Sequence, residues 1–265
     1  MKKSRHHNFT LIEILAVLMI LGIIFTLMLP SFNRMINGNK VDQMASRLKI
    51  GLDQAQSQAV TSRRNVALIL PNKSGDWSDP GEEYCLGGYR LAYVTMEGSK
   101  NEDAVEEGSE ATELTYDECT FEKWVPDSEW TNRPDGAYLV LVLPKSSGDY
   151  DQTKWMDGSS PTGAKGVTTS LSSVIAGGAD ALIKVKDLPD SSGNKKDYDH
   201  CAIVFSPYGE IRNPELKLVV AEAVENNGTL MFPSRSSSGN PMNYLVLGIN
   251  KFTGRTSFQP LEKVE

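Results

Sequence analysis

The 265-residue sequence predicts an α+β protein in which a long N-terminal α-helix, with a transmembrane half and an amphipathic half, packs on a mostly antiparallel β-sheet domain. Apolar residues fill 9–29 almost without interruption, an apolar stripe with helical spacing runs through 30–64, and short runs rich in Val, Leu, Ile and Tyr recur beyond. We expect a leader at 1–8, a transmembrane helix at 9–29, its amphipathic continuation at 30–64 and a β-rich globular domain at 65–265.

The first apolar run is long enough to cross a bilayer. Between Ile14 and Leu29 only Gly22 and Thr26 are not strongly apolar, and a helix begun at Phe9 would span roughly 30 Å. The cations at positions 2, 3 and 5 predict a cytoplasmic N-terminus and a body on the far side of the membrane. A cleaved secretory signal peptide is the alternative, but no small-x-small cleavage site follows. We therefore expect a retained anchor.

A single carboxylate, Glu13, lies near the start of this run. A charge within an inserted helix costs about 2.5 to 3.5 kcal/mol, so it needs a partner. The segment contains no cation that could pair with Glu13. The partner is therefore expected to be a new amino group or a group on another chain.

The stretch "FTLIEILAVLMILGII", followed by Pro30, resembles the N-terminal signature of type IV pilins and of the pseudopilins of type II secretion. The resemblance implies that a prepilin peptidase cuts between Asn8 and Phe9 and methylates the amine of Phe9. It also implies that Glu13 pairs with the N-terminal amine of a neighbouring subunit, and that Pro30 shapes the helix. The family usually has Gly before the cut, where this chain has Asn8.

Beyond Pro30 the apolar residues recur at steps of mostly three or four, which predicts an amphipathic helix packed against a folded body. They are Phe32, Met35, Ile36, Val41, Met44, Ala45, Leu48, Leu52, Ala55 and Ala59. The Asn-Gly-Asn at 37–39 is expected to weaken this helix.

The residue pattern of the body predicts strands at 65–70, 89–95, 137–143, 181–185, 201–206, 216–224 and 244–249, separated by Gly, Pro, Asn and Ser clusters. Two loop-rich inserts are expected: about 97–130, which is acidic, and about 146–178, which is rich in Ser, Gly and Thr. Trp124, Trp130 and Trp155 lie in these inserts and are expected either to form local cores under long loops or to contact a partner.

Three segments refine the resemblance. "AQSQAVTSRRNVALIL", "AIVFSPYGEI" and "NYLVLGINKFTGRTSF" resemble the end of the helix and the two closing hairpins of H-type minor pseudopilins, with turns at 207–209 and 253–254. The resemblance covers about 9–70 and 200–258, and implies a pilin-like fold there.

The sequence offers little site chemistry. Cys85, Cys119 and Cys201 form no zinc or CxxC pattern. Cys85 with Cys119 is a candidate disulfide, one of three pairings that the sequence leaves open, and three buried thiols are the alternative. His200, the histidine outside the leader, is expected to be structural, because no nucleophile motif accompanies it.

We expect no cofactor and no metal. A loop calcium at Asp149, Asp151 and Asp157 is the alternative, but the spacing lacks the EF-hand glutamate.

These features predict a non-enzymatic structural subunit of a type II secretion pseudopilus or type IV pilus-like filament. The expected partners are the prepilin peptidase, other pseudopilins or pilins, and the bacterial inner membrane, with the body in the periplasm. A net charge of −7 disfavours nucleic acid, and with it a DNA-uptake subunit. The alternative from another class is a membrane-anchored periplasmic ligand-binding module or enzyme.

Overall fold

The structure is a computed structural model. It describes residues 11–71, 84–96, 118–144, 167–168, 182–189, 195–196, 200–226, 229–233 and 241–259, with the backbone alone at several positions, among them 13 and 27–39. The chain divides into two compact units, Met1–Asn39 and Lys40–Glu265. The boundary between them follows the Asn-Gly-Asn at 37–39.

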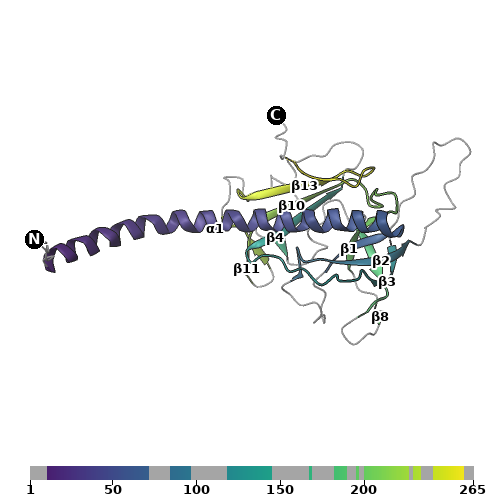
Figure 1. Ribbon diagram of the computed structural model, residues 1–265, viewed down its shortest axis with the longest axis horizontal. Helices are drawn as coiled ribbons and strands as arrows, with labels where there is room; N and C mark the ends of the chain where they lie inside the picture. The colour runs from purple at the N-terminus through teal and green to yellow at the C-terminus, as the bar shows by residue number, and fades with distance from the viewer. Residues whose placement is uncertain are drawn as a thin grey trace, which may run out of the picture. The chain divides into compact units, whose positions relative to one another are not determined.

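The helix α1 extends from Leu11 to Ser62 (Figure 1). Its backbone remains helical through Pro30 and through 37–39. At its end Arg63 has a φ of 53°, and the N–H of Arg64 donates to the carbonyl of Ala59 at 3.3 Å. This is a Schellman arrangement, in which a residue in the left-handed conformation terminates the helix, a place usually taken by Gly.

Within the described residues, fourteen strands follow the helix. Their bounds are β1 Val66–Leu70, β2 Arg90–Met96, β3 Glu118–Trp124, β4 Ala137–Pro144, β5 Val167–Thr168, β6 Ile183–Lys186, β7 Leu188–Pro189, β8 Lys195–Lys196, β9 Cys201–Phe205, β10 Leu216–Glu222, β11 Val224–Asn226, β12 Thr229–Met231, β13 Tyr244–Ile249 and β14 Thr256–Gln259. The seven strands predicted from the sequence overlap β1, β2, β4, β6, β9, β10 and β13.

Five strands close into a barrel in the order β1-β2-β3-β6-β9. The pairs β1–β2, β1–β9, β2–β3 and β6–β9 are antiparallel, whereas β3 and β6 are parallel. Cross-strand partners such as Ala67, Ala92 and Val204 share one face of the closed sheet and belong to a core separate from the helix. These small side chains fit the interior of a narrow barrel.

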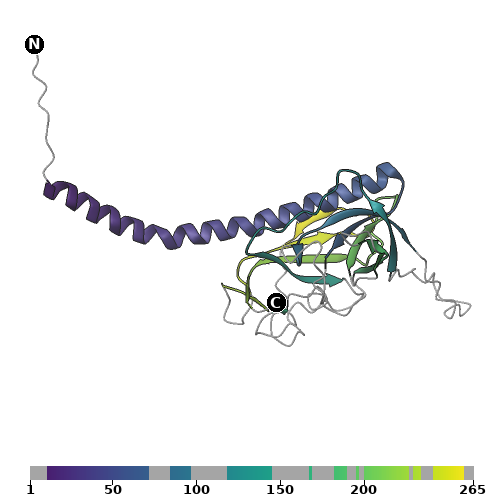
Figure 2. The same ribbon diagram turned by 90° about the horizontal axis from the view of Figure 1, so that it is seen from below.

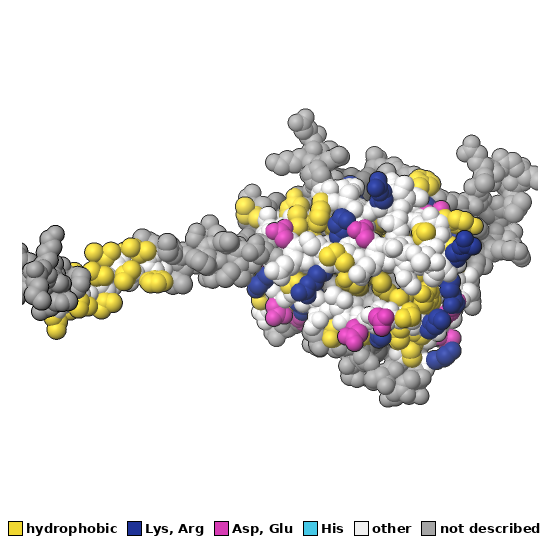
Figure 3. Space-filling view, viewed as in Figure 1, with side chains coloured by type: hydrophobic (Ala, Val, Ile, Leu, Met, Phe, Trp, Pro, Cys, Tyr) yellow, Lys and Arg dark blue, Asp and Glu magenta, His cyan; other side chains and the backbone are white. Residues whose placement is uncertain are grey.

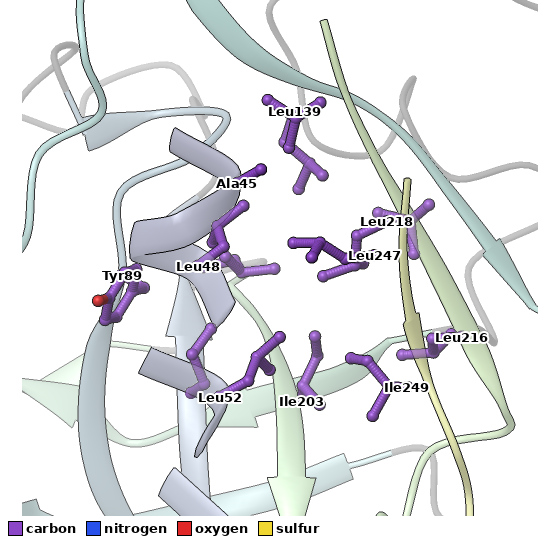
Figure 4. Packing of buried hydrophobic residues seen from close by; sticks show 14 of the residues in the cluster. Ala45, Leu48, Leu52, Tyr89, Leu139, Ile203, Leu216, Leu218, Leu247 and Ile249 are labelled. Atoms are coloured by element: carbon purple, nitrogen blue, oxygen red, sulfur yellow. The ribbon is translucent and has the colours of Figure 1, made fainter. Parts of the chain in front are cut away.

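A second sheet has the order β14-β13-β10-β4 and is antiparallel throughout. The helical segment of the second unit lies along the strands (Figure 2). Its apolar stripe is 1% exposed or less and consists of Val41, Met44, Ala45, Leu48, Leu52, Ala55 and Ala59. Figure 4 shows Ala45, Leu48 and Leu52 directed towards Leu247 and its neighbours on the sheet. The main core of the body therefore lies between α1 and the strands.

Two buried polar side chains make further contacts, Tyr89 with α1 and Asn213 with strand β9 of the barrel. The hydroxyl of Tyr89 donates to the carbonyl of Arg47 at 2.9 Å. The ring of Tyr89 packs so closely against Gly51 that a Cβ added at Gly51 would lie 2.5 Å from the ring. The buried Asn213 accepts from the N–H of Val204 at 2.8 Å and donates to a neighbouring carbonyl of β9 at 3.0 Å.

The predicted fold class is wrong. The strands do not form one mostly antiparallel sheet beneath a helix: five close into a barrel with a parallel pair, and four form a separate sheet, beside the small sheets β11-β12-β5 and β7-β8. Across the ranges described above, no helix combines the length and hydropathy that a membrane crossing needs. The strand β3 also lies within the predicted insert 97–130, which is thus partly a barrel element.

Candidate functional site

The first unit presents large apolar side chains to solvent. Twelve of them between residues 11 and 25 are at least 43% exposed: Leu11, Ile12, Ile14, Leu15, Val17, Leu18, Met19, Ile20, Leu21, Ile23, Ile24 and Phe25. Figure 3 shows this part of α1 covered by apolar side chains. Because successive residues of an α-helix are about 100° apart, these side chains point in every direction around the axis.

A helix that is apolar on all sides is stable only when another apolar surface encloses it. Burying one such side chain contributes roughly 1.5 to 3 kcal/mol, so the stretch holds a large unused driving force for association. The polar side chain of Thr26 does not oppose this, because its hydroxyl donates to the carbonyl of Gly22 at 2.8 Å. The segment is therefore a candidate assembly surface.

The predicted processing and assembly residues all belong to the first unit. Asn8 and Phe9 lie outside the described residues. Glu13 and Pro30 lie within α1, where the structure describes the backbone alone. Their predicted roles in cleavage, methylation and pairing thus remain predictions.

The structure does not join Cys85 and Cys119 in the candidate disulfide; they and Cys201 are buried thiols. Burial raises the pKa of the Cys119 thiol to about 12, with a smaller contribution from Cys201. Cys119 is therefore protonated and unreactive at neutral pH.

His200 is 1% exposed at the start of β9, and its carbonyl accepts from the N–H of Val185 at 2.8 Å. Burial lowers the pKa of His200 to about 4. The imidazole is therefore neutral at physiological pH and belongs to the packed interior.

No cluster of three His, Cys, Asp or Glu suited to a metal occurs among the described residues. The candidate calcium ligands Asp149, Asp151 and Asp157 lie outside them.

Two of the predicted insert tryptophans, Trp124 and Trp130, are partly buried and pack against the barrel core. Trp124 lies edge-on to Phe121 with ring centroids 4.9 Å apart, and to Trp130 at 5.6 Å. The guanidinium carbon of Arg90 lies 4.0 Å from the centroid of the Trp124 ring. Trp124 and Trp130 thus extend the barrel core instead of forming a core of their own, and Trp155 lies outside the described residues.

Two tight turns meet α1 at Gln56. The side-chain amide of Gln56 donates to the carbonyl of Gly209 at 3.0 Å and also to that of Thr253. Gly209 and Gly254 have φ of 87° and 62°, which residues with a side chain rarely adopt. The two turns are therefore held against each other and against the helix.

Each turn is also closed by its own hydrogen bonds. In the first, the N–H of Gly209 donates to the carbonyl of Ser206 at 2.9 Å. In the second, the side-chain oxygen of Asn250 accepts from the N–H and the hydroxyl of Thr253, both at 3.0 Å. Tyr208 and Phe252 lie in these rigid turns and are 87% and 76% exposed.

Sequence reasoning predicted both turns but not the two exposed aromatics. The available signal was an aromatic residue inside a short polar turn, as in "SPYGE" and "NKFTG". Comparison of the chain with protein-family models, with characterised proteins and with solved structures finds no match.

Proposed function

We propose that the chain is a structural subunit of a filament, a minor pseudopilin or pilin-like protein that assembles through the N-terminal part of α1. The observation that carries this proposal is the run of twelve exposed apolar side chains around one helix. Packing several such helices side by side buries apolar surface on every face at once.

The N-terminal sequence supports the same proposal. After cleavage between Asn8 and Phe9, the new amine of Phe9 is a cation at the start of the apolar helix. Glu13 of an incoming subunit pairs with that amine on a neighbour, so the charge is neutralised only on assembly. This pairing sets the stagger between adjacent helices.

The proposal includes the location and the partners of the chain. The precursor is held at the bacterial inner membrane by its apolar run, with its basic N-terminus cytoplasmic and its body periplasmic. The prepilin peptidase and other pseudopilins or pilins are the partners. The subunit contributes no catalysis, and its body meets neighbouring subunits.

The first experiment tests processing. The chain is produced with and without a prepilin peptidase, and the N-terminal mass is measured. We expect a methylated Phe9 only when the peptidase is present. An intact N-terminus in both samples would remove the processing step from the proposal and favour an anchored enzyme or binding module.

The second experiment tests assembly. Leu18→Glu places a charge on the apolar surface, whereas Gln54→Glu places the same charge on an exposed polar position of α1. We expect Leu18→Glu to abolish pelleting of the assembled protein and Gln54→Glu to leave it unchanged. Glu13→Ala should be cleaved normally but should pellet poorly. Equal pelleting of all three variants would refute assembly through this helix.

A further inference from the structure

One end of the body carries an exposed aromatic pair on a rigid support. Tyr208 and Phe252 are 87% and 76% exposed. Val60 of α1 is 49% exposed and packs beside Gly209. A Cβ added at Gly209 would lie 3.3 Å from the Cγ2 of Val60. These three residues are called the aromatic end. Because Gln56 and the turn hydrogen bonds already fix the backbone, little freedom is lost when this end binds a partner.

The other end of the body carries exposed aliphatic and methionine side chains. Val224 and Met231 face each other across the β11–β12 pair and are 56% and 44% exposed. Met242 is 67% exposed and precedes Asn243. The side-chain amide of Asn243 donates to the carboxylate of Glu222, at the end of β10, at 3.2 Å, and its backbone carbonyl accepts from the N–H of Glu222 at 3.1 Å. Val224, Met231 and Met242 are called the methionine end.

Two elements show that these ends are opposite. The strand β10 spans roughly 20 Å, with Leu216 paired to Ile249 beside the aromatic end and Glu222 beside the methionine end. Along α1, Lys40 lies near Gly136, whose carbonyl accepts from the N–H of Ala223 next to Val224 of the methionine end. Gln56, about 24 Å further on, donates to the carbonyl of Gly209, next to Tyr208 of the aromatic end. Figure 1 shows β11 and the β13–β14 turn at opposite ends of the body.

We propose that the aromatic end of one copy docks on the methionine end of the next copy. This inference rests on the proposed function: when the Lys40–Ser62 segments of α1 in neighbouring subunits lie parallel and offset along their axis, the Gln56 end of one body faces the Lys40 end of the next. Two different surfaces then meet in every contact, so the contact repeats along an open filament instead of closing into a two-fold dimer.

The chemistry of the two ends is complementary. Methionine side chains are unbranched and polarisable, and adapt to aromatic rings. Tyrosine and phenylalanine on rigid turns are typical anchors of protein interfaces. The three side chains at each end make a contact smaller than the roughly 1,200 Å² of a stable complex. The contact therefore fixes the register of bodies that the helices already hold together.

The test uses the full-length processed chain and cysteine cross-linking. One variant carries Phe252→Cys, a second Met242→Cys, and a third both. The native cysteines are buried, so a short bismaleimide reagent reports on the introduced thiols. We expect a ladder of dimers, trimers and longer products from the double variant, and monomers from each single variant.

Pelleting of the same samples measures assembly independently. Pelleting without a ladder would overturn the end-to-end contact and leave the proposed function standing. Cross-linked dimers from Phe252→Cys alone would show a two-fold contact and also overturn it. Loss of both pelleting and the ladder would refute the proposed function together with this inference.

Side-chain variants in the double-cysteine background sharpen the result. Tyr208→Ala should lower the ladder yield about tenfold, because an anchor side chain is lost. Tyr208→Phe should restore it. Phe258→Ala is the matched control, since Phe258 is 49% exposed on β14 away from both ends. An equal loss with Tyr208→Ala and Phe258→Ala would contradict the assignment of the aromatic end.

Discussion

His200 makes the stability of the body depend on pH in a predictable window. Its pKa is about 4 in the folded chain, lowered by burial, against an ordinary value of 6.5 that applies to the unfolded chain. As pH falls, the unfolded chain binds a proton first. Stability is therefore full above about pH 6.5, falls between pH 6.5 and 4, and levels off below. A difference of about 2.5 pKa units corresponds to about 3 kcal/mol.

The assay compares the wild-type chain with His200→Gln by urea denaturation in a non-ionic detergent. Tryptophan fluorescence is followed at about pH 7.5, 5.5 and 4. Both chains share the same carboxylates, so the difference between their free energies of unfolding isolates the histidine. We expect wild type to lose about 3 kcal/mol relative to the variant across this range. A difference that stays constant with pH would refute the reasoning.

Three further predictions concern the packing of the body. Because the pKa of Cys119 is about 12, iodoacetamide should label this thiol only after unfolding, as peptide mass analysis will show; labelling of the native chain at pH 7 would contradict its burial. Gly51→Ala should lower the free energy of unfolding by about 1 to 3 kcal/mol, since the added Cβ approaches the Tyr89 ring within 2.5 Å. The control Gly22→Ala, with nothing within 4 Å, should not destabilise the chain. Asn213→Ala should cost about 2 to 4 kcal/mol in the same denaturation assay, because two buried backbone groups of β9 lose their partners; a loss below about 1 kcal/mol would mean that water replaces them.

Local patterns predicted the elements better than their arrangement. The stripe from Val41 to Ala59 is buried, and every predicted strand overlaps an observed one. A pattern with a period of two reports that a strand has two different faces. It does not report whether the sheet closes, because closure depends on which distant strands become neighbours. The barrel therefore could not be read from the strand pattern.

The strand β3 shows why composition misled the prediction. Its segment combines outward charges at Glu118 and Glu122 with the buried Cys119, and it follows a long acidic stretch. Both glutamates form ion pairs, with Lys186 and Arg64. The charged residues that predicted a solvated insert thus lie on the outer face of a barrel strand. Its parallel pairing with β6 joins segments more than sixty residues apart, which no local signal reveals.

The sequence likewise predicted only one part of the candidate site. The exposed apolar helix follows directly from an almost uninterrupted run of apolar residues. The aromatic end does not, because its support is the side chain of Gln56, which joins turns 153 and 197 residues away. Whether an aromatic residue is exposed depends on tertiary packing, which cannot be inferred from a single sequence.

The buried stripe along α1 determines how the body responds to force. A pull applied at Lys40 along the helix axis loads the contacts of Met44, Leu48 and Leu52 together, since all lie on the same continuous rod. Parallel loading of this kind resists rupture far better than peeling one contact at a time. Such a pull therefore acts on the helix and the strands packed against it as one body.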